Sequence, residues 1–110
     1  MMKWEFIFYS NRVKRDVLAL PKGLLAEFYA MQKIMEEKGS ALGMPYTRAM
    51  GDGLVEMRLS DKDSIARVFY CTIKKYEIFV LHGFVKKTRK TPDRDLQLAR
   101  KRLKEVKQYD

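Results

Sequence analysis

The chain is poor in the residue types that build disulfides and zinc sites. Its 110 residues include one cysteine, Cys71, and one histidine, His82. A lone cysteine excludes a disulfide bond within the chain, and one Cys with one His does not make a zinc ligand set. A glycine-rich phosphate loop and a nucleophile elbow are also missing from the sequence. We therefore expect no metal and no cofactor.

Long apolar runs are missing as well. No stretch approaches the ~20 apolar residues that a membrane span needs. The apolar segment from Trp4 to Tyr9 contains Glu5 and is too short for the hydrophobic region of a signal peptide. We expect a cytoplasmic protein without a membrane partner.

The charges of the chain are unbalanced. There are 23 Lys and Arg residues against 14 Asp and Glu residues, which gives a net charge of +9. A content of 46% hydrophobic residues indicates a globular chain, and the length suits one domain over residues 1–110. Such an excess of cations favours a polyanionic partner, either a nucleic acid, an anionic membrane or an acidic protein. The alternative is a surface charge that only keeps the protein soluble.

Hydrophobic periodicity predicts the order β-α-α-β-β-β-β-α. Apolar residues at helical spacing, followed by Gly39, predict a helix over 22–38 after a shorter one over 12–20. Thr91 and Pro92 are the expected N-cap and first residue of a last helix. The expected strands cover 3–9, 47–50, 54–59, 65–73 and 76–85. These elements predict an α+β fold, a small mostly antiparallel sheet with an N-terminal helical hairpin and a C-terminal helix, all helices packed on one face.

Two arginines stand on strands that are expected to form a hairpin. Alternation places Glu56 and Arg58 on one face of their strand, and a turn at residues 60–64 brings Arg67 of the next strand close to Arg58. Two adjacent guanidinium groups repel each other unless an anion lies between them. Glu56 is a structural source of that anion, and a bound phosphate is a functional one. The alternative is a pair of solvated surface charges.

The last strand ends in a dense group of cations. Phe84 is followed by Lys86, Lys87, Arg89 and Lys90. Cations that hold phosphate beside an aromatic ring that stacks on a base are typical of sites for single-stranded nucleic acid. His82, on the same strand face as Phe84, is either an acid–base group or a hydrogen-bonded core residue.

Three segments of the chain carry a family resemblance. Gly53–Arg58 (GLVEMR), Arg67–Tyr70 (RVFY) and Leu81–Pro92 (LHGFVKKTRKTP) closely resemble the phage-related HigB-like branch of the RelE/ParE toxin superfamily. Ala99–Leu103 also fits this branch, and the HGFVKKT block is the most specific part. The resemblance covers nearly the whole chain and implies a RelE-like fold.

The resemblance implies the toxin of a type II toxin–antitoxin system. Such a toxin is a ribosome-dependent endoribonuclease that inhibits translation by cutting messenger RNA through 2′-hydroxyl attack, without metal, and is neutralised by a cognate helix-turn-helix antitoxin. Arg67 matches the catalytic arginine of the superfamily, and Arg58 matches a basic position on the preceding strand. The candidate catalytic residues are Arg58, Arg67, His82, Phe84, Lys86 and Lys87, and the candidate RNA-binding residues are Arg89, Lys90 and Arg94.

The sequence departs from the family at the proton-transfer groups. It lacks the C-terminal tyrosine that RelE uses near the last strand and the His–Asp cluster of other HigB toxins. Lys and Arg side chains are already protonated at neutral pH and therefore accept a proton poorly. His82 and a lysine of lowered pKa are the two candidates for the proton acceptor. Two other functions remain open: a ParE-like gyrase poison on the same scaffold, and a non-catalytic nucleic-acid-binding module. The density of cations around the last strand favours RNA cleavage.

Overall fold

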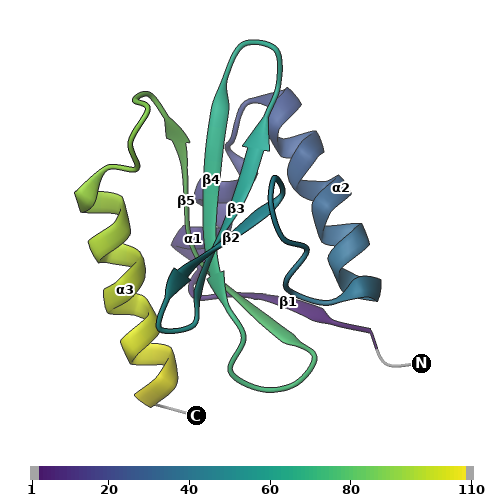
Figure 1. Ribbon diagram of the computed structural model, residues 1–110, viewed down its shortest axis with the longest axis vertical. Coiled ribbons are helices and arrows are strands. Elements are labelled where there is room, and N and C mark those ends of the chain that lie inside the picture. Colours follow the sequence, from purple (N-terminus) through teal and green to yellow (C-terminus); the bar gives the residue numbers. More distant parts are fainter. Residues whose placement is uncertain (1–2, 109–110) are drawn as a thin grey trace.

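The computed structural model describes residues 3–108. The elements follow the predicted order: β1 (Glu5–Phe8), α1 (Asn11–Leu18), α2 (Lys22–Lys38), β2 (Thr47–Gly51), β3 (Leu54–Ser60), β4 (Ile65–Cys71), β5 (Glu77–Lys86) and α3 (Asp93–Gln108) (Figure 1). In this part of the chain, no helix combines the length and the apolar character needed to cross a membrane.

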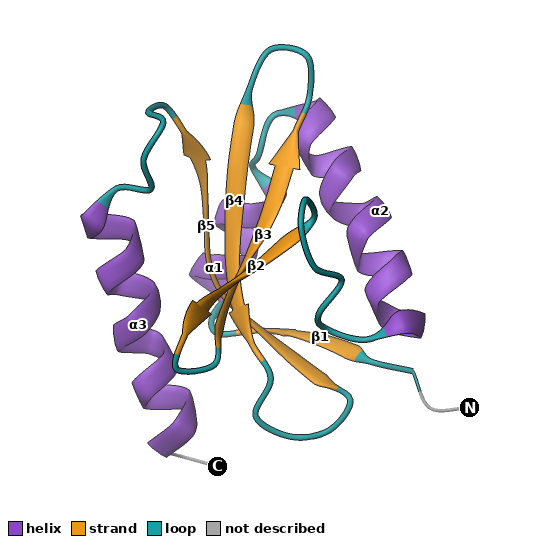
Figure 2. Ribbon diagram, viewed as in Figure 1, coloured by secondary structure: helices purple, strands orange, loops and turns teal. Residues whose placement is uncertain are grey.

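The five strands form one sheet in the order β1-β5-β4-β3-β2 (Figure 2). β2, β3, β4 and β5 are joined by antiparallel pairing, and only β1 lies parallel to its neighbour β5. The α+β fold with a mostly antiparallel sheet is therefore confirmed, and it is compatible with a RelE-like fold.

The helices cover both faces of the sheet, so the expectation that they share one face is wrong. α1 and α2 pack on one face, in a core that includes Val68 of β4. α3 packs on the other face, where Phe69 of the same strand lies against Ala99 and Leu103. Val68 and Phe69 are both fully buried, and a strand that is apolar on both sides needs cover on both sides. Figure 1 shows the sheet between α2 and α3.

The two N-terminal helices begin and end near the predicted positions. Ser10 caps α1, because its Oγ accepts a hydrogen bond from the backbone N–H of Val13 at 3.2 Å. α1 ends at Leu18, two residues before the predicted end. α2 spans Lys22–Lys38 as predicted, and Gly39 follows it with φ of 102°. α1 packs mainly against β5 and α2 against β3, so the sheet is the main partner of each helix.

Packing explains why the HGFVKKT block contains a glycine, Gly83. It lies on the face of β5 that α1 covers, and a Cβ at this position would lie 2.8 Å from Cγ2 of Val17. Only a residue without a side chain lets α1 approach β5 so closely. This glycine is therefore required by packing.

The start of α3 differs from the predicted cap. The helix begins at Asp93, one residue after the predicted first position, and the backbone N–H of Leu96 donates to the carbonyl of Pro92. The hydroxyl of Thr91 donates to Oε2 of Glu56 at 3.1 Å. Thr91 therefore ties the start of α3 to strand β3, and this contact positions the site described next.

Candidate active site

Arg58 and Arg67 form a cross-strand pair on the face that α3 partly covers. They are directly opposite each other in the ladder between β3 and β4, as predicted. Cβ atoms of such a pair lie about 5 Å apart, so the two guanidinium groups share one small region. Arg67 is only 5% exposed, whereas Arg58 reaches further toward solvent.

Glu56 supplies the carboxylate between the two arginines. Its Oε1 lies 3.3 Å from Nη1 of Arg58 and 3.7 Å from Nε of Arg67. Glu56 is 1% exposed, and its other oxygen accepts the bond from Thr91. One carboxylate therefore faces two guanidinium cations, which leaves the buried group with a net positive charge.

Arg67 is incompletely hydrogen-bonded. Its Nη1 donates to the carbonyl of Ala66 at 3.0 Å, but its buried Nε has no hydrogen-bond partner among the described residues. Burial and the charge of Arg58 lower the pKa of Arg67, while the carboxylate of Glu56 raises it. A guanidinium carries five N–H donors, and an anion beside Arg67 would satisfy those that the protein leaves open.

A cleft of about 260 Å³ opens beside this pair. Its walls come from β2, β3, the end of β5 and the start of α3, and they are Arg48, Met50, Glu56, Arg58, Lys86, Arg89, Lys90, Thr91, Asp93 and Leu96. Five of these side chains are cations and two are carboxylates, so the lining has a net charge of +3. The cleft is therefore suited to a phosphate-containing ligand.

Lys86 lies at the end of β5 and lines the cleft. Partial burial lowers its pKa, and so do the charges of Arg67, Arg58 and Arg48, while Glu56 opposes them. Lys86 therefore loses its proton more readily than an isolated lysine. Sequence analysis gave two candidate proton acceptors, His82 and a lysine of lowered pKa, and Lys86 is that lysine.

The remaining candidate residues are distributed around the cleft. Phe84 lies directly opposite Arg67 in the ladder between β4 and β5. Arg89 and Lys90 line the cleft, whereas Lys87 and Arg94 are exposed and lie outside its lining. The structure therefore brings Arg58, Lys86, Arg89 and Lys90 together, with Arg67 and Phe84 beside them.

His82 is held by a partner that the sequence reasoning missed. Its Nε2 lies 2.6 Å from Oδ1 of Asp95 on α3, and its ring stacks on Phe84 with centroids 5.4 Å apart. The sequence suggested that a His–Asp cluster was lacking, because Asp95 becomes a neighbour only when α3 packs on the sheet. His82 is buried and does not line the cleft.

Arg48 and Thr91 are also site residues that the sequence reasoning missed. Arg48 lies opposite Glu56 in the ladder between β2 and β3, and Thr91 bonds to the same carboxylate. The signal for Arg48 was present, because extending the antiparallel register to the short strand at 47–50 places it across from Glu56. Among residues 3–108, no three His, Cys, Asp or Glu side chains gather closely enough to hold a metal ion.

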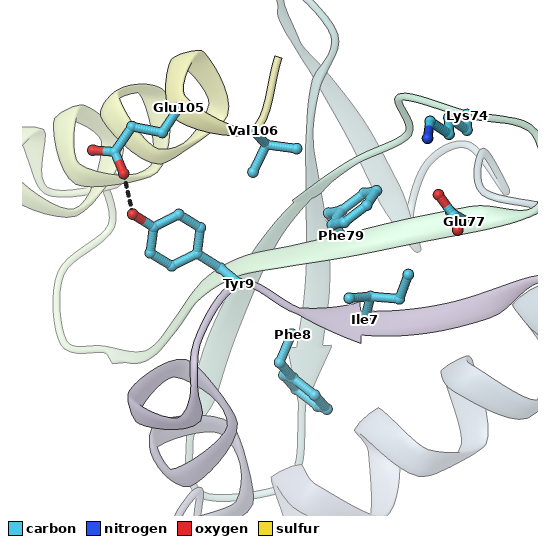
Figure 3. A pocket seen from close by; sticks show the side chains of 8 residues that line it. All are labelled: Ile7, Phe8, Tyr9, Lys74, Glu77, Phe79, Glu105 and Val106. Carbon is cyan, nitrogen blue, oxygen red and sulfur yellow. Dashed lines mark hydrogen bonds between the residues drawn. The ribbon is translucent and has the colours of Figure 1, made fainter. Parts of the chain in front are cut away.

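A larger cavity, of about 580 Å³, lies between β1, β5 and the C-terminal part of α3 (Figure 3). Its lining combines apolar side chains, such as Ile7 and Phe79, with the carboxylates of Glu77 and Glu105 and one lysine. The hydroxyl of Tyr9 donates to Glu105. This lining does not suit a phosphate group, so the smaller cationic cleft is the candidate active site.

Comparison with known proteins identifies the family of the chain. A model of the family described as phage derived protein Gp49-like (DUF891) matches residues 15–104, which include every candidate site residue. A comparison with curated proteins found no relative of the chain. The family match covers most of the sequence and the whole cationic cleft. The chain therefore belongs to the phage-derived Gp49-like family, which is grouped with the RelE-like toxins of type II toxin–antitoxin systems.

Proposed function

We propose that this protein is a HigB-like toxin that cuts messenger RNA on the ribosome. The observation that carries the proposal is the pair formed by the buried Arg67 and the partly exposed Arg58, which share one carboxylate and leave Nε of Arg67 without a hydrogen bond among the described residues. Glu56 balances only one of the two guanidinium charges, so an anion that binds beside the pair would offset the remaining positive charge. The phosphate of an RNA chain is such an anion, and it matches the planar guanidinium group.

RNA brings its own nucleophile to this site. The 2′-hydroxyl oxygen attacks the adjacent phosphorus, the bond from phosphorus to the 5′ oxygen breaks, and a 2′,3′-cyclic phosphate is left. Arg58 and Arg67 align the phosphate and neutralise the charge that builds on its non-bridging oxygens. No metal ion or cofactor takes part in this proposed mechanism.

Lys86 is the proposed acceptor of the 2′-hydroxyl proton. It lines the cleft, and its lowered pKa raises the fraction of neutral amine near pH 7. The departing 5′ oxygen takes a proton from water. His82 is a weaker candidate for direct proton transfer because it lies outside the cleft lining, bound to Asp95. Its proposed contribution is to hold Phe84.

The surrounding residues are proposed to bind the rest of the RNA. Arg89 and Lys90 line the cleft and contact the sugar–phosphate backbone, and the exposed Lys87 and Arg94 extend this positive surface. Phe84 stacks on a base beside the phosphate held by Arg67.

The proposed partner is a helix-turn-helix antitoxin. A cleft of net positive charge is inhibited by any acidic segment that covers its cations, and charged surfaces of opposite sign associate quickly. We expect the association rate with the antitoxin to fall as salt is added. An association rate that is indifferent to ionic strength would contradict inhibition by an acidic segment.

The test of the proposed function is cleavage on translating ribosomes. Wild-type protein should create new ends in the messenger RNA that carry a 2′,3′-cyclic phosphate. Cutting should persist when a chelator is added at a level that leaves the ribosomes intact. If no message is cut and DNA gyrase stalls, the gyrase-poison alternative is correct. Binding of RNA without any cutting would instead identify a non-catalytic binding module.

A further inference from the structure

Four residues form a row across the sheet on the cleft face. Arg58 is opposite Arg67, and Arg67 is opposite Phe84. Tyr46 immediately precedes β2, and its carbonyl accepts a hydrogen bond from the backbone N–H of Arg58 at 2.9 Å. Thr47 is paired with Met57, so the register continues to Tyr46 opposite Arg58. From β2 to β5 the row consists of Tyr46, Arg58, Arg67 and Phe84, so two cations lie between two aromatic residues.

Extending the alternation of β2 by one residue places Tyr46 on the side of the sheet that carries the cleft, outside the residues that line it. Thr47 is buried and interacts with Tyr70, which belongs to the core under α1 and α2. Arg48 lines the cleft on the opposite face. Tyr46 is the last residue of the turn before β2, and its N–H donates to the carbonyl of Gly43 at 3.0 Å. Its carbonyl already takes part in the ladder with Arg58, so we infer that the alternation of β2 extends to Tyr46 and that its side chain shares the face of Arg48. Tyr46 is 54% exposed, although its ring is large and apolar.

We propose that Tyr46 is a base-stacking site for single-stranded RNA, an inference that rests on the proposed function. The scissile phosphate lies on Arg58 and Arg67, one neighbouring base stacks on Tyr46, and the base on the other side approaches Phe84. Three strand spacings of about 4.8 Å separate the two aromatic positions, roughly 14 Å in all. This span accommodates a phosphate between two bases that are splayed apart. Aromatic rings stack on unpaired bases and not on the paired bases of a duplex, so the row favours single-stranded RNA.

A row of this kind would position the substrate as well as bind it. Holding the two bases apart turns the sugar and its 2′-hydroxyl relative to the phosphate, so stacking on Tyr46 supports the in-line attack. Tyr46 touches the base and not the reacting atoms, so its loss should raise KM more than it lowers kcat. Loss of Arg67 should instead lower kcat.

The test uses short RNA oligonucleotides with a 2′-O-methyl group at the cleavage position, which blocks cutting. Each oligonucleotide carries 2-aminopurine on the 5′ or the 3′ side of the uncut phosphate, because stacking on an aromatic ring quenches its fluorescence. The proteins to compare are the wild type, Tyr46→Ala, Tyr46→Leu and Tyr46→Phe. Tyr29→Ala is the matched control, because Tyr29 is 50% exposed on α2, on the opposite side of the sheet.

Wild-type protein should bind both oligonucleotides and quench at least one of them. Tyr46→Ala and Tyr46→Leu should bind about 5- to 100-fold more weakly and lose the quenching at one position, which is the range expected for one stacked base. Tyr46→Phe should keep both properties, and Tyr29→Ala should match the wild type.

Two contrary results separate this proposal from the proposed function. If Tyr46→Ala binds and quenches like the wild type while messages are still cut on ribosomes, Tyr46 is not a stacking site and the proposed function stands. If the wild type neither binds these oligonucleotides nor cuts messages on ribosomes, the proposed function fails. Equal losses in Tyr46→Ala and Tyr29→Ala would also overturn the stacking site, because they would show a non-specific effect.

Discussion

Strand β4 presents two different surfaces to the two sides of the molecule. Toward α1 and α2 it places Val68 and Tyr70 in an apolar core, where both are fully buried. Toward the cleft it places Arg67, a buried cation with a like charge beside it. Adjacent residues of one strand therefore have opposite physical roles: burial of Val68 stabilises the fold, while burial of Arg67 requires a counter-charge, which Glu56 shares between Arg67 and Arg58.

The two faces also differ in how completely they are covered. The α1–α2 face is closed by two helices, and Gly83 lets α1 approach β5 closely. On the other face, α3 packs over Phe69 and leaves the region of Arg58 open to the cleft. One side of the sheet can therefore remain available for binding because the other side supplies much of the packing.

The largest expected effect comes from Arg67. Arg67→Ala should lower the cleavage rate by about 10²- to 10³-fold, because it removes a charge that contacts the phosphate in the transition state. Toxicity should disappear in cells that make the variant at normal levels. Arg67→Lys should restore little, since an ammonium group lacks the planar pair of donors. The measurements are growth inhibition and the cleavage rate on ribosomes.

The neighbouring Val68 is the matched control. Val68→Ala should lower the free energy of unfolding by about 2 kcal/mol, through lost burial of two methyl groups on the α1–α2 face. Its cleavage rate per folded molecule should stay close to the wild type. Full toxicity of Arg67→Ala, or equal losses of activity in both variants, would remove the distinction between the two faces.

Lys86 tests the proton transfer on the cleft side. Its pKa is lowered, so the neutral amine forms as pH rises through that pKa, and the cleavage rate should rise over the same range. Lys86→Arg keeps the charge but cannot lose the proton near neutral pH, so the rate should fall by about 10²-fold and lose this pH dependence. Lys90→Arg, in the same cleft, should keep the wild-type profile. An unchanged profile in Lys86→Arg would exclude Lys86 as the proton acceptor.

Glu56 tests whether the arginine pair depends on one buried carboxylate. Glu56→Gln should lower the free energy of unfolding by about 3 kcal/mol, because Arg58 and Arg67 then face each other without a counter-charge. The exposed Glu27 on α2 is the control, and Glu27→Gln should change stability by no more than about 0.5 kcal/mol. Chemical denaturation measures both. Equal stability of Glu56→Gln and wild type would show that the pair is not held by Glu56.

The smallest expected effect is at the turn between β3 and β4. Asp61 accepts hydrogen bonds from the backbone N–H groups of Asp63 and Ser64, and these bonds lower its pKa. A folded-state pKa below the unfolded value stabilises the protein above about pH 4, and this stabilisation is lost as pH falls through the folded pKa. Asp61→Asn should therefore be less stable than wild type at pH 7, and the difference should shrink at pH 3. Thermal unfolding at both pH values measures this, with Asp63→Asn as the neighbouring control. A stability difference that does not shrink at pH 3 would contradict the account.

Much of the fold was predictable because its signals are local. The apolar spacing from Leu24 to Met35, with Pro21 before it and Gly39 after it, was sufficient to define α2 at both ends. The turn at residues 60–64 set the hairpin register, and so the pairing of Arg58 with Arg67 was also predictable. These features depend on periodicity and on turn residues within one short segment.

The contacts made by α3 were not predictable in the same way. The bond from Thr91 to Glu56 and the pairing of His82 with Asp95 join residues on different elements. Both contacts depend on which face of the sheet α3 covers. Central strands that are apolar on both sides indicate that each face is covered, but they do not indicate which helix covers which face. The lowered pKa of Lys86 was not predictable either, because it depends on burial and on charges from three other strands, those of Arg67, Arg58 and Arg48.

The most direct test of the account is a message with one modified sugar. The central claim is that the cations of the cleft activate a 2′-hydroxyl supplied by the substrate. A messenger RNA with a single 2′-deoxy nucleotide immediately upstream of the mapped cleavage site should still be bound on the ribosome by the wild-type protein but should resist cutting there, while unmodified sites in the same message are cut normally. Cutting of the modified site at the normal rate would contradict the account.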